Sequence, residues 1–251
     1  MQLTTETTPR GAVLVLHHSV SRHNRLLRVP GHRPSAFATL FSLFYVLDNQ
    51  KVIAKLIKPK SFPKDYLRRY LLDSEAARIF WSTVQLNTIG IAAPEPLGFS
   101  VILNPFARYE SIYYAEYKAD TITLKTRLPY LSEADRRHLL ANIARDYAHM
   151  INQYFNLKDL HFENILVGHQ DEHWWIDTDL RRIRPLQRLL AEIRRELSRL
   201  KRRTTDVLSP EEWDYFNAQV TQNTHVIQIP YISAADHGTQ YDSSQLPQVD
   251  E

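Results

Sequence analysis

Three side chains in the second half of the chain have a spacing that constrains the fold more than any other feature. Asp159 precedes Asn164 by five residues, and Asp177 follows Asn164 by thirteen. Two short apolar runs, 165–167 and 174–176, flank a polar segment between Asn164 and Asp177, and this pattern predicts a β-hairpin. Because a hairpin returns the chain to its starting point, we expect the two carboxylates and the amide to meet at one place.

This set of groups suits the transfer of a phosphoryl group to a hydroxyl. The carboxylate of Asp159 would accept the hydroxyl proton, and the oxygens of Asn164 and Asp177 would hold Mg²⁺ against the phosphates. Asp179 is an alternative to Asp177, but Asp177 directly follows the predicted strand and is the better candidate. A loop aspartate that only caps a turn is the competing interpretation of Asp159.

A lysine upstream completes the set. Lys55 ends the run Val-Ile-Ala-Lys, which predicts a strand and resembles the Val-Ala-Ile-Lys signature of protein-kinase-like folds. Its ammonium could reach the α- and β-phosphates of ATP. Glu75 lies twenty residues later, on a helix expected at about 66–88, where it could pair with Lys55. A strand lysine taken alone is usually a surface residue, so the interpretation of Lys55 depends on the acidic groups downstream.

Other polar residues in the loop receive smaller roles. His161 and Glu163 are expected to shape the loop or to contact substrate. A zinc site made of His161, His169 and His173 has little support, because their spacing fits no standard ligand pattern. The chain has no cysteine, which excludes disulfides, thiolate zinc sites and thiol nucleophiles.

Longer runs of sequence carry a resemblance to a known family. They are Gly-Ile-Ala-Ala-Pro-Glu-Pro-Leu-Gly at 90–98, Asp-Leu-His at 159–161 with Asn-Ile-Leu at 164–166, and Ile-Asp-Thr-Asp at 176–179 with Arg181 and Arg182. In this order they resemble the bacterial lipopolysaccharide kinases, which phosphorylate Kdo and heptose sugars and are a branch of the protein-kinase-like fold. The resemblance spans roughly residues 51–184.

The resemblance implies a role for each matching residue, with ATP and Mg²⁺, or Mn²⁺, as cofactors. Lys55 would bind the phosphates with Glu75 as its ion-pair partner, Asp159 would be the base, Asn164 and Asp177 would bind the metal, and the backbone around Glu116 and Tyr117 would form the adenine-binding hinge.

Two features depart from the pattern of this family. Leu157 stands where a histidine usually precedes the catalytic aspartate by two residues, and Gly31 is the only glycine where a glycine-rich phosphate loop is expected. Such a loop needs glycine so that backbone N–H groups can approach the phosphates. A catalytically weak, kinase-like binding or scaffold protein is therefore an alternative. An Ala-Pro-Glu segment is also missing after Asp177, which argues against a regulated eukaryotic-type protein kinase.

The order of expected elements indicates an α+β, bilobal protein-kinase-like fold. Strands are expected at 12–20, 36–46, 51–57 and 111–117, and long helices are expected after Ser132, at 186–200 and after Ser209-Pro210. We expect an N-terminal nucleotide-binding lobe over residues 1–118, with an antiparallel sheet and one helix. A mostly helical catalytic lobe would span 119–233, followed by a flexible polar tail at 234–251.

Positive charge is concentrated in one stretch. Ten Lys or Arg residues and two acids lie between Arg181 and Arg203, in a chain with net charge +3 and a pI near 9.0. This surface could hold an acceptor's phosphates or an anionic membrane. Nucleic acid is a weaker candidate, and a solvated helix face is the plain alternative.

The ends and the hydropathy of the chain bear on its location. No stretch approaches the roughly 20 apolar residues of a membrane helix, and residues 1–10 lack the apolar core of a signal peptide. We therefore expect a cytoplasmic protein, with peripheral attachment to the inner membrane through the basic stretch as a further expectation.

These observations predict an ATP- and magnesium-dependent kinase of a Kdo or heptose hydroxyl in the lipopolysaccharide core, or of another anionic glycan. A kinase of another small molecule or of a protein is the alternative. An aminoglycoside kinase is disfavoured, because such enzymes surround a cationic drug with acidic residues, whereas arginines follow Asp177 in this chain.

Overall fold

The computed structural model describes residues 3–7, 12–17, 36–38, 42–47, 52–59, 73–102, 109–170 and 172–226. Up to residue 47 it describes the backbone alone. The segment around Gly31, where a phosphate loop was sought, and the expected tail at 234–251 lie outside the described residues.

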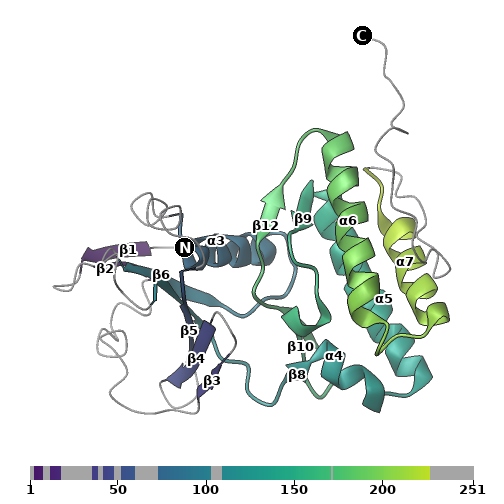
Figure 1. Cartoon of the computed structure of the whole chain (residues 1–251), viewed down its shortest axis with the longest axis horizontal. Helices are drawn as coiled ribbons and strands as arrows, with labels where there is room; N and C mark the ends of the chain where they lie inside the picture. The colour runs from purple at the N-terminus through teal and green to yellow at the C-terminus, as the bar shows by residue number, and fades with distance from the viewer. Residues whose placement is uncertain are drawn as a thin grey trace, which may run out of the picture.

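One large sheet carries the N-terminal part of the chain (Figure 1). Every neighbouring pair of strands is antiparallel, and β4 pairs with β5, the strand that carries Lys55. The apolar run at 36–46 forms two strands rather than one. In order across the sheet, the strands are β1 (Leu3–Thr7), β2 (Ala12–His17), β6 (Pro96–Ile102), β7 (Ser111–Glu116), β5 (Val52–Ile57), β4 (Ser42–Leu47) and β3 (Ala36–Ala38).

A single described helix, α3 (Glu75–Thr88), packs on this sheet against β6 and β7. It does not run unbroken from residue 66 as expected, because Ser74 is extended and its Oγ accepts a hydrogen bond from the N–H of Ala77 at 3.2 Å. Serine at this position caps a helix start. The helix ends before Gly90, whose φ of +82° lies in the left-handed region that favours glycine. Apolar residues of helix and sheet form one core: Ala76, Ala77, Ile79, Phe80, Phe99, Val101 and Tyr113.

The C-terminal part is mostly helical. The long helices α5 (Glu133–Asn152), α6 (Leu186–Thr204) and α7 (Pro210–Asn223) lie side by side around a second core (Figure 1). Two expected starts are confirmed: the Oγ of Ser132 accepts from the N–H of Asp135 at 3.2 Å, and Ser209 forms a full capping box with Glu212. The helix α5 buries one face, which includes Leu140, Ile143, Tyr147, Met150 and Ile151.

Short strands and turns fill the space between the large sheet and these helices. The expected hairpin is confirmed as β10 (Ile165–Val167) paired with β11 (His173–Trp175), and β8 (Ile122–Thr123) joins it. A two-stranded sheet pairs β9 (Phe155–Leu157) with β12 (Leu180–Arg182). The helix α4 (Leu124–Arg127) and the 3₁₀ turns η2 (Leu128–Tyr130) and η3 (Phe162–Asn164) complete the described elements.

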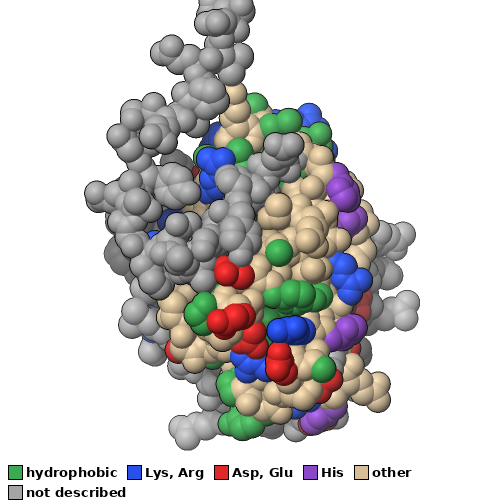
Figure 2. Space-filling model, turned by 90° about the vertical axis from the view of Figure 1, so that its right-hand side faces the viewer, with side chains coloured by type: hydrophobic (Ala, Val, Ile, Leu, Met, Phe, Trp, Pro, Cys, Tyr) green, Lys and Arg blue, Asp and Glu red, His purple; other side chains and the backbone are tan. Residues whose placement is uncertain are grey.

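The surface of the helical part is mixed in charge where Figure 2 displays it. Acidic and basic side chains are interspersed on that face, so the positive charge of the chain is not gathered there. Within the described ranges, no helix combines the length and the apolar character that crossing a membrane requires.

Candidate active site

A cavity of about 470 Å³ lies between the large sheet and the small sheet of β8, β10 and β11. Its walls are mostly apolar, with a few polar groups converging, as in sites that bind a cofactor-sized ligand. The apolar residues come from both parts of the chain: Ile53, Ile79, Pro94, Ala115, Leu166 and Ile176. Five of the residues expected to form the site line the same cavity: Lys55, Glu116, Tyr117, Asn164 and Asp177.

Lys55 and Asp177 form an ion pair in this cavity, 122 residues apart in sequence. The buried strand β5 aims Lys55 at the cavity, and its ammonium donates a hydrogen bond to Oδ1 of Asp177. Within the described part of the chain, Oδ2 of Asp177 has no protein partner. Asp177 has a φ of +53°, a conformation that is uncommon for a residue with a side chain and that clusters at functional sites.

Asn164 connects the loop of Asp159 to the strand that leads to Asp177. Its Nδ2 donates to the carbonyl oxygen of Asp159 at 3.2 Å, and its own carbonyl accepts from the N–H of Ile176 at 2.8 Å. These two bonds fix the loop and the strand end relative to each other. The loop of Asp159 and the chain before Asp177 are therefore held close together.

The side chain of Asp159 is not among those that line the cavity. It is 59% exposed, and its Oδ1 accepts a hydrogen bond from Nη1 of Arg203 at 2.6 Å. The structure thus places Asn164 and Asp177 in the cavity and Asp159 beside it, paired with an arginine from α6.

Glu75 begins α3 and does not line the cavity, so its pairing with Lys55 stays a prediction. The α3 residues that do line it are Ile79 and Thr83. Thr83 accepts a hydrogen bond from the hydroxyl of Tyr113 at 3.2 Å. Burial raises the pKa of Tyr113, so this hydroxyl stays neutral.

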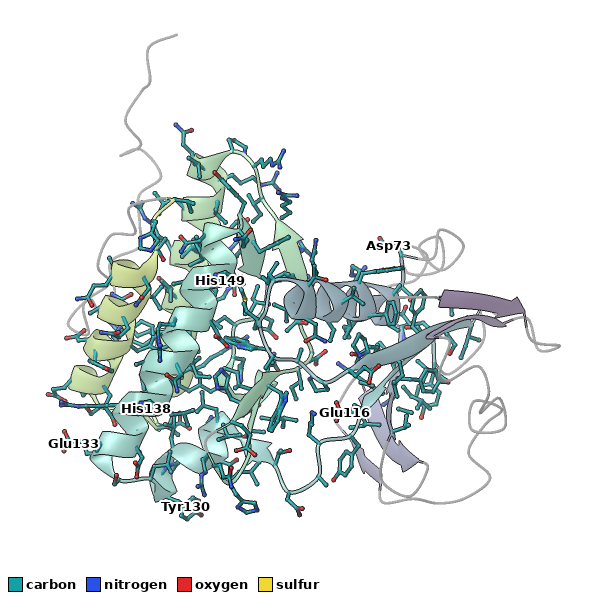
Figure 3. All side chains as sticks on the ribbon, turned by 180° about the vertical axis from the view of Figure 1, so that it is seen from behind. Asp73, Glu116, Tyr130, Glu133, His138 and His149 are labelled. Carbon is teal, nitrogen blue, oxygen red and sulfur yellow. The ribbon has the colours of Figure 1, made fainter. Side chains whose placement is uncertain are left out.

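The expected hinge follows β7. The carboxylate of Glu116 accepts from the N–H of Glu95 at 3.2 Å and from the ammonium of Lys118 at 2.7 Å. Lys118 also lies 4.9 Å from the ring centre of Trp174. Because the carboxylate is held by the protein, an adenine base would have to bind the backbone of this segment. Figure 3 shows Glu116 between the large sheet and the helical part.

The oxygen groups in the cavity fit a magnesium ion. An amide oxygen and a carboxylate are hard ligands, and Mg²⁺ is usually held by one or two protein groups with water and phosphate oxygens completing the octahedron. The geometry favours Asp177 over Asp179, because Asp179 accepts a hydrogen bond from Nη2 of Arg181 at 3.1 Å and does not line the cavity.

The remaining loop residues have structural contacts. Nδ1 of His161 accepts from the N–H of Glu163 at 3.0 Å, and burial lowers the pKa of His161, which keeps the ring neutral. Glu163 lines the cavity. His173, considered for zinc, instead bonds through Nε2 to Oδ2 of Asp146 at 2.8 Å.

Some residues of the site were not predicted. Asp146 also accepts from the indole N–H of Trp175 at 2.9 Å and so fixes β11, which leads to Asp177. Thr83, Tyr113 and Arg203 likewise reach the site through tertiary packing. No local sequence pattern identifies these residues. The periodicity of a helix or strand indicates which of its faces is buried, but not which distant residue packs against that face.

Comparisons with known proteins bear on this arrangement. Residues 50–222 match the model of the lipopolysaccharide kinase (Kdo/WaaP) family. A solved structure described as WaaP in complex with acyl carrier protein is similar with a TM-score of 0.57 at 16% identity, over 83% of this chain and 88% of that chain. This likeness shows a kinase-like fold.

Two structures of WbdD give weaker matches. The first, described as a bifunctional kinase-methyltransferase, has a TM-score of 0.40 at 16% identity over 61% of this chain and 33% of that chain. The second has a TM-score of 0.44 at 15% identity, over 63% and 36%. No curated protein sequence matches this chain.

Proposed function

Because the chain belongs to the lipopolysaccharide kinase (Kdo/WaaP) family, we propose that it transfers the γ-phosphate of ATP to a hydroxyl of Kdo or heptose in the lipopolysaccharide inner core. The protein is a kinase, as its family is. The observation that carries the proposal is the meeting of Lys55, Asn164 and Asp177 in one cavity, although they come from distant parts of the chain.

Each of these groups has a task in phosphoryl transfer. Lys55 would hold the phosphates of ATP, and the oxygens of Asn164 and Asp177 would bind Mg²⁺. The bound ion would offset the negative charge that builds up on the phosphates. Asp159 would orient the acceptor hydroxyl and accept its proton. Most of the rate would come from positioning and from fixed charges, since the protein forms no covalent bond to the phosphate.

We propose two lobes, with the nucleotide between them. The first, residues 1–118, would hold the adenine and phosphates through β5, β7 and the hinge at Glu116 and Tyr117. The second, residues 119–233, would supply Asp159, Asn164 and Asp177. Glu75 would orient Lys55 from the first lobe. In support, the cavity is lined by residues from both parts of the chain.

The basic stretch would serve the acceptor or the membrane that carries it. Arg181, Arg182, Arg184, Arg188, Arg195, Arg202 and Arg203 are all exposed. Lipopolysaccharide precursors are anionic lipids, and basic surfaces are attracted to such lipids. We propose that the protein works in the cytoplasm and attaches peripherally to the inner membrane through these residues.

Exchange of one cavity residue tests the proposed chemistry. Asp177→Asn removes a charge but keeps a residue type that tolerates the φ of +53°. We expect phosphate transfer from ATP to a Kdo- or heptose-containing lipid acceptor to fall roughly 100- to 1,000-fold, as when a preorganised charge is lost.

Asp179→Asn is the matched control, because Asp179 lies two residues away and pairs with Arg181 outside the cavity. This variant should transfer phosphate at nearly the wild-type rate. Full activity of Asp177→Asn, or equal losses in both variants, would contradict the assignment.

One observation favours the alternative of a catalytically weak, kinase-like binding protein. The carboxylate of Asp159 is engaged by Arg203 and does not line the cavity. In that case the wild-type protein would bind Mg-ATP and transfer no phosphate to any acceptor. The same assay of phosphate transfer decides between the two functions.

A further inference from the structure

The contact between Arg203 and Asp159 is the starting point. Arg203 is the penultimate residue of α6, at the end of the helix where a positive charge is favoured by the helix dipole. Its Nη1 donates to Oδ1 of Asp159 at 2.6 Å across 44 residues of sequence. The buried face of α6 is formed by other residues, among them Leu189, Ile193 and Leu197.

The pair leaves most of the guanidinium unused. An arginine has five N–H donors in a planar fork that matches a phosphate or a carboxylate. In the described part of the chain, Nη1 is the one donor of Arg203 with a protein partner, and the side chain is 41% exposed. The remaining N–H groups therefore have no protein partner among the described residues, although they belong to a side chain in contact with the residue proposed as the base.

A second acidic side chain, Glu196, interacts electrostatically with both Arg203 and Asp159. Glu196 lies two helical turns before Arg203, is 1% exposed, and accepts a hydrogen bond from Arg199 at 2.8 Å. Its other oxygen, Oε2, is buried without a partner among the described residues. Asp159 lies within electrostatic reach of this carboxylate. Burial raises the pKa of Glu196, Asp159 raises it further and Arg203 lowers it, so Arg203 offsets the repulsion between the two acidic groups.

The ion pair also occupies one of the two carboxylate oxygens that Asp159 could use in its proposed role. A carboxylate that accepts a proton from a hydroxyl must present an oxygen to that hydroxyl at hydrogen-bond distance. Exposed ion pairs contribute little stability, so the pair can be exchanged for another at small cost. A phosphate offers Arg203 a bidentate contact that is stronger than its single bond to Asp159.

We propose that Arg203 is an anion-binding residue for the acceptor, which releases Asp159 when a phosphate or carboxylate of the acceptor takes its guanidinium. This inference rests on the proposed function and adds a substrate class to it. The acceptor carries a negative group close to the hydroxyl that is attacked. The empty enzyme keeps its base paired, which limits the transfer of phosphate to water.

Binding of inorganic phosphate tests the anion site apart from catalysis. We expect the wild-type protein to bind phosphate, measured by calorimetry at constant ionic strength, and Arg203→Gln to bind it about tenfold or more weakly. Arg202→Gln removes the adjacent charge and should weaken binding much less. Equal losses in the two variants would show that phosphate is attracted by the overall positive charge of the helix and not by Arg203 itself. This result would overturn the proposal.

A control on another helix matches both the charge and the pairing. Arg137 is exposed and forms an ion pair with Glu133, which Figure 3 shows at the start of α5. Arg137→Gln should bind phosphate as the wild-type protein does. A loss in this variant as large as that in Arg203→Gln would also overturn the proposal.

Kinetics then separate the acceptor from the nucleotide. Arg203→Gln should raise the KM for the anionic acceptor about tenfold or more, leave the KM for ATP unchanged, and increase ATP hydrolysis without acceptor several-fold. A rise in the KM for ATP would place Arg203 on the γ-phosphate and refute the inference. Lipopolysaccharide acceptors could remain unphosphorylated by the wild-type protein and by every variant, while phosphate binding and ATP hydrolysis still depend on Arg203. That result would contradict the proposed acceptor and would support the anion site.

Discussion

Asp177 shows how a single residue can carry both backbone and charge requirements of a site. Its φ of +53° turns the chain directly after Ile176, whose N–H is bonded to the carbonyl of Asn164. This turn aims the carboxylate at Lys55. Aspartate and asparagine are the residues with side chains that visit this conformation most readily. The residue type is therefore favoured at this position by conformation as well as by chemistry.

Glu196 gives a prediction about pH at the same scale. Burial raises its pKa, and Arg199 partly offsets this effect. The folded state thus favours the neutral carboxyl, so the stability linked to this group is greatest at low pH and is lost as pH rises through the folded-state pKa. We expect Glu196→Gln to be more stable than the wild-type protein at about pH 8, and the two to be alike at about pH 4.

Urea unfolding at several pH values measures this difference. Glu192→Gln is the matched control, because Glu192 lies one turn away on α6 and pairs with Arg195 at the surface. The control should show no difference that grows with pH. A wild-type protein that gains stability over Glu196→Gln as pH rises would contradict the predicted sign.

Among the elements, helix starts were the most predictable feature. Ser132 and Ser209-Pro210 mark the starts of α5 and α7, because a capping side chain and its N–H partner lie within three residues of each other. Ser74 does the same for α3, although the helix was expected to begin at about residue 66. The hairpin and the meeting of Asn164 with Asp177 were also predicted, since turn and spacing are local. The contact of Arg203 with Asp159 was not, because it depends on how α6 packs.

The junction of α5 and α7 carries a prediction about stability. Nε and Nη2 of Arg136 donate to the two carboxylate oxygens of Glu212, and Nη1 and Nη2 also donate to the carbonyls of Leu128 and Val207. The side chains are 17% and 13% exposed. Arg136→Ala leaves the mostly buried carboxylate of Glu212 without its partner. We therefore expect a loss of about 3 kcal/mol in the free energy of unfolding.

Thermal and urea unfolding check this value. A loss of this size should lower Tm by about 6–12 °C in a chain of this length. Arg137→Ala, which removes an exposed pair with Glu133, should cost less than about 1 kcal/mol. Arg136 lowers the pKa of Glu212, so the stability from the pair is lost as pH falls through the folded-state pKa, and the two proteins should converge in acid. Equal effects of the two substitutions would refute the assignment.

At the scale of the whole molecule, residues from both of its parts line the cavity of Lys55 and Asp177. A ligand there would contact the large sheet through Lys55 and the turn before β10 through Asn164, so it would bind the folded state and not the unfolded chain. We expect Mg-ATP to stabilise the protein by about 2.7 kcal/mol when its concentration is 100 times its Kd. This corresponds to a rise in Tm of about 5–10 °C.

Differential scanning fluorimetry with Mg-ATP measures this shift. ATP with a chelator in place of Mg²⁺ should give a much smaller rise, because Asp177 would then face the phosphates without a cation. Asp177→Asn should lose most of the magnesium-dependent part. No stabilisation at any concentration of Mg-ATP would show that the cavity is not a nucleotide site.

Several contacts join the parts on either side of this cavity. One is covalent, the segment from Tyr117 to Thr121. Trp175 N–H donates to the carbonyl of Ala92 at 2.9 Å, Leu180 N–H donates to Oγ of Ser82 at 3.0 Å, and Lys55 pairs with Asp177 inside the cavity. Each of these contacts crosses from one part to the other, so a change that separates the two parts must break them as well as open the cavity.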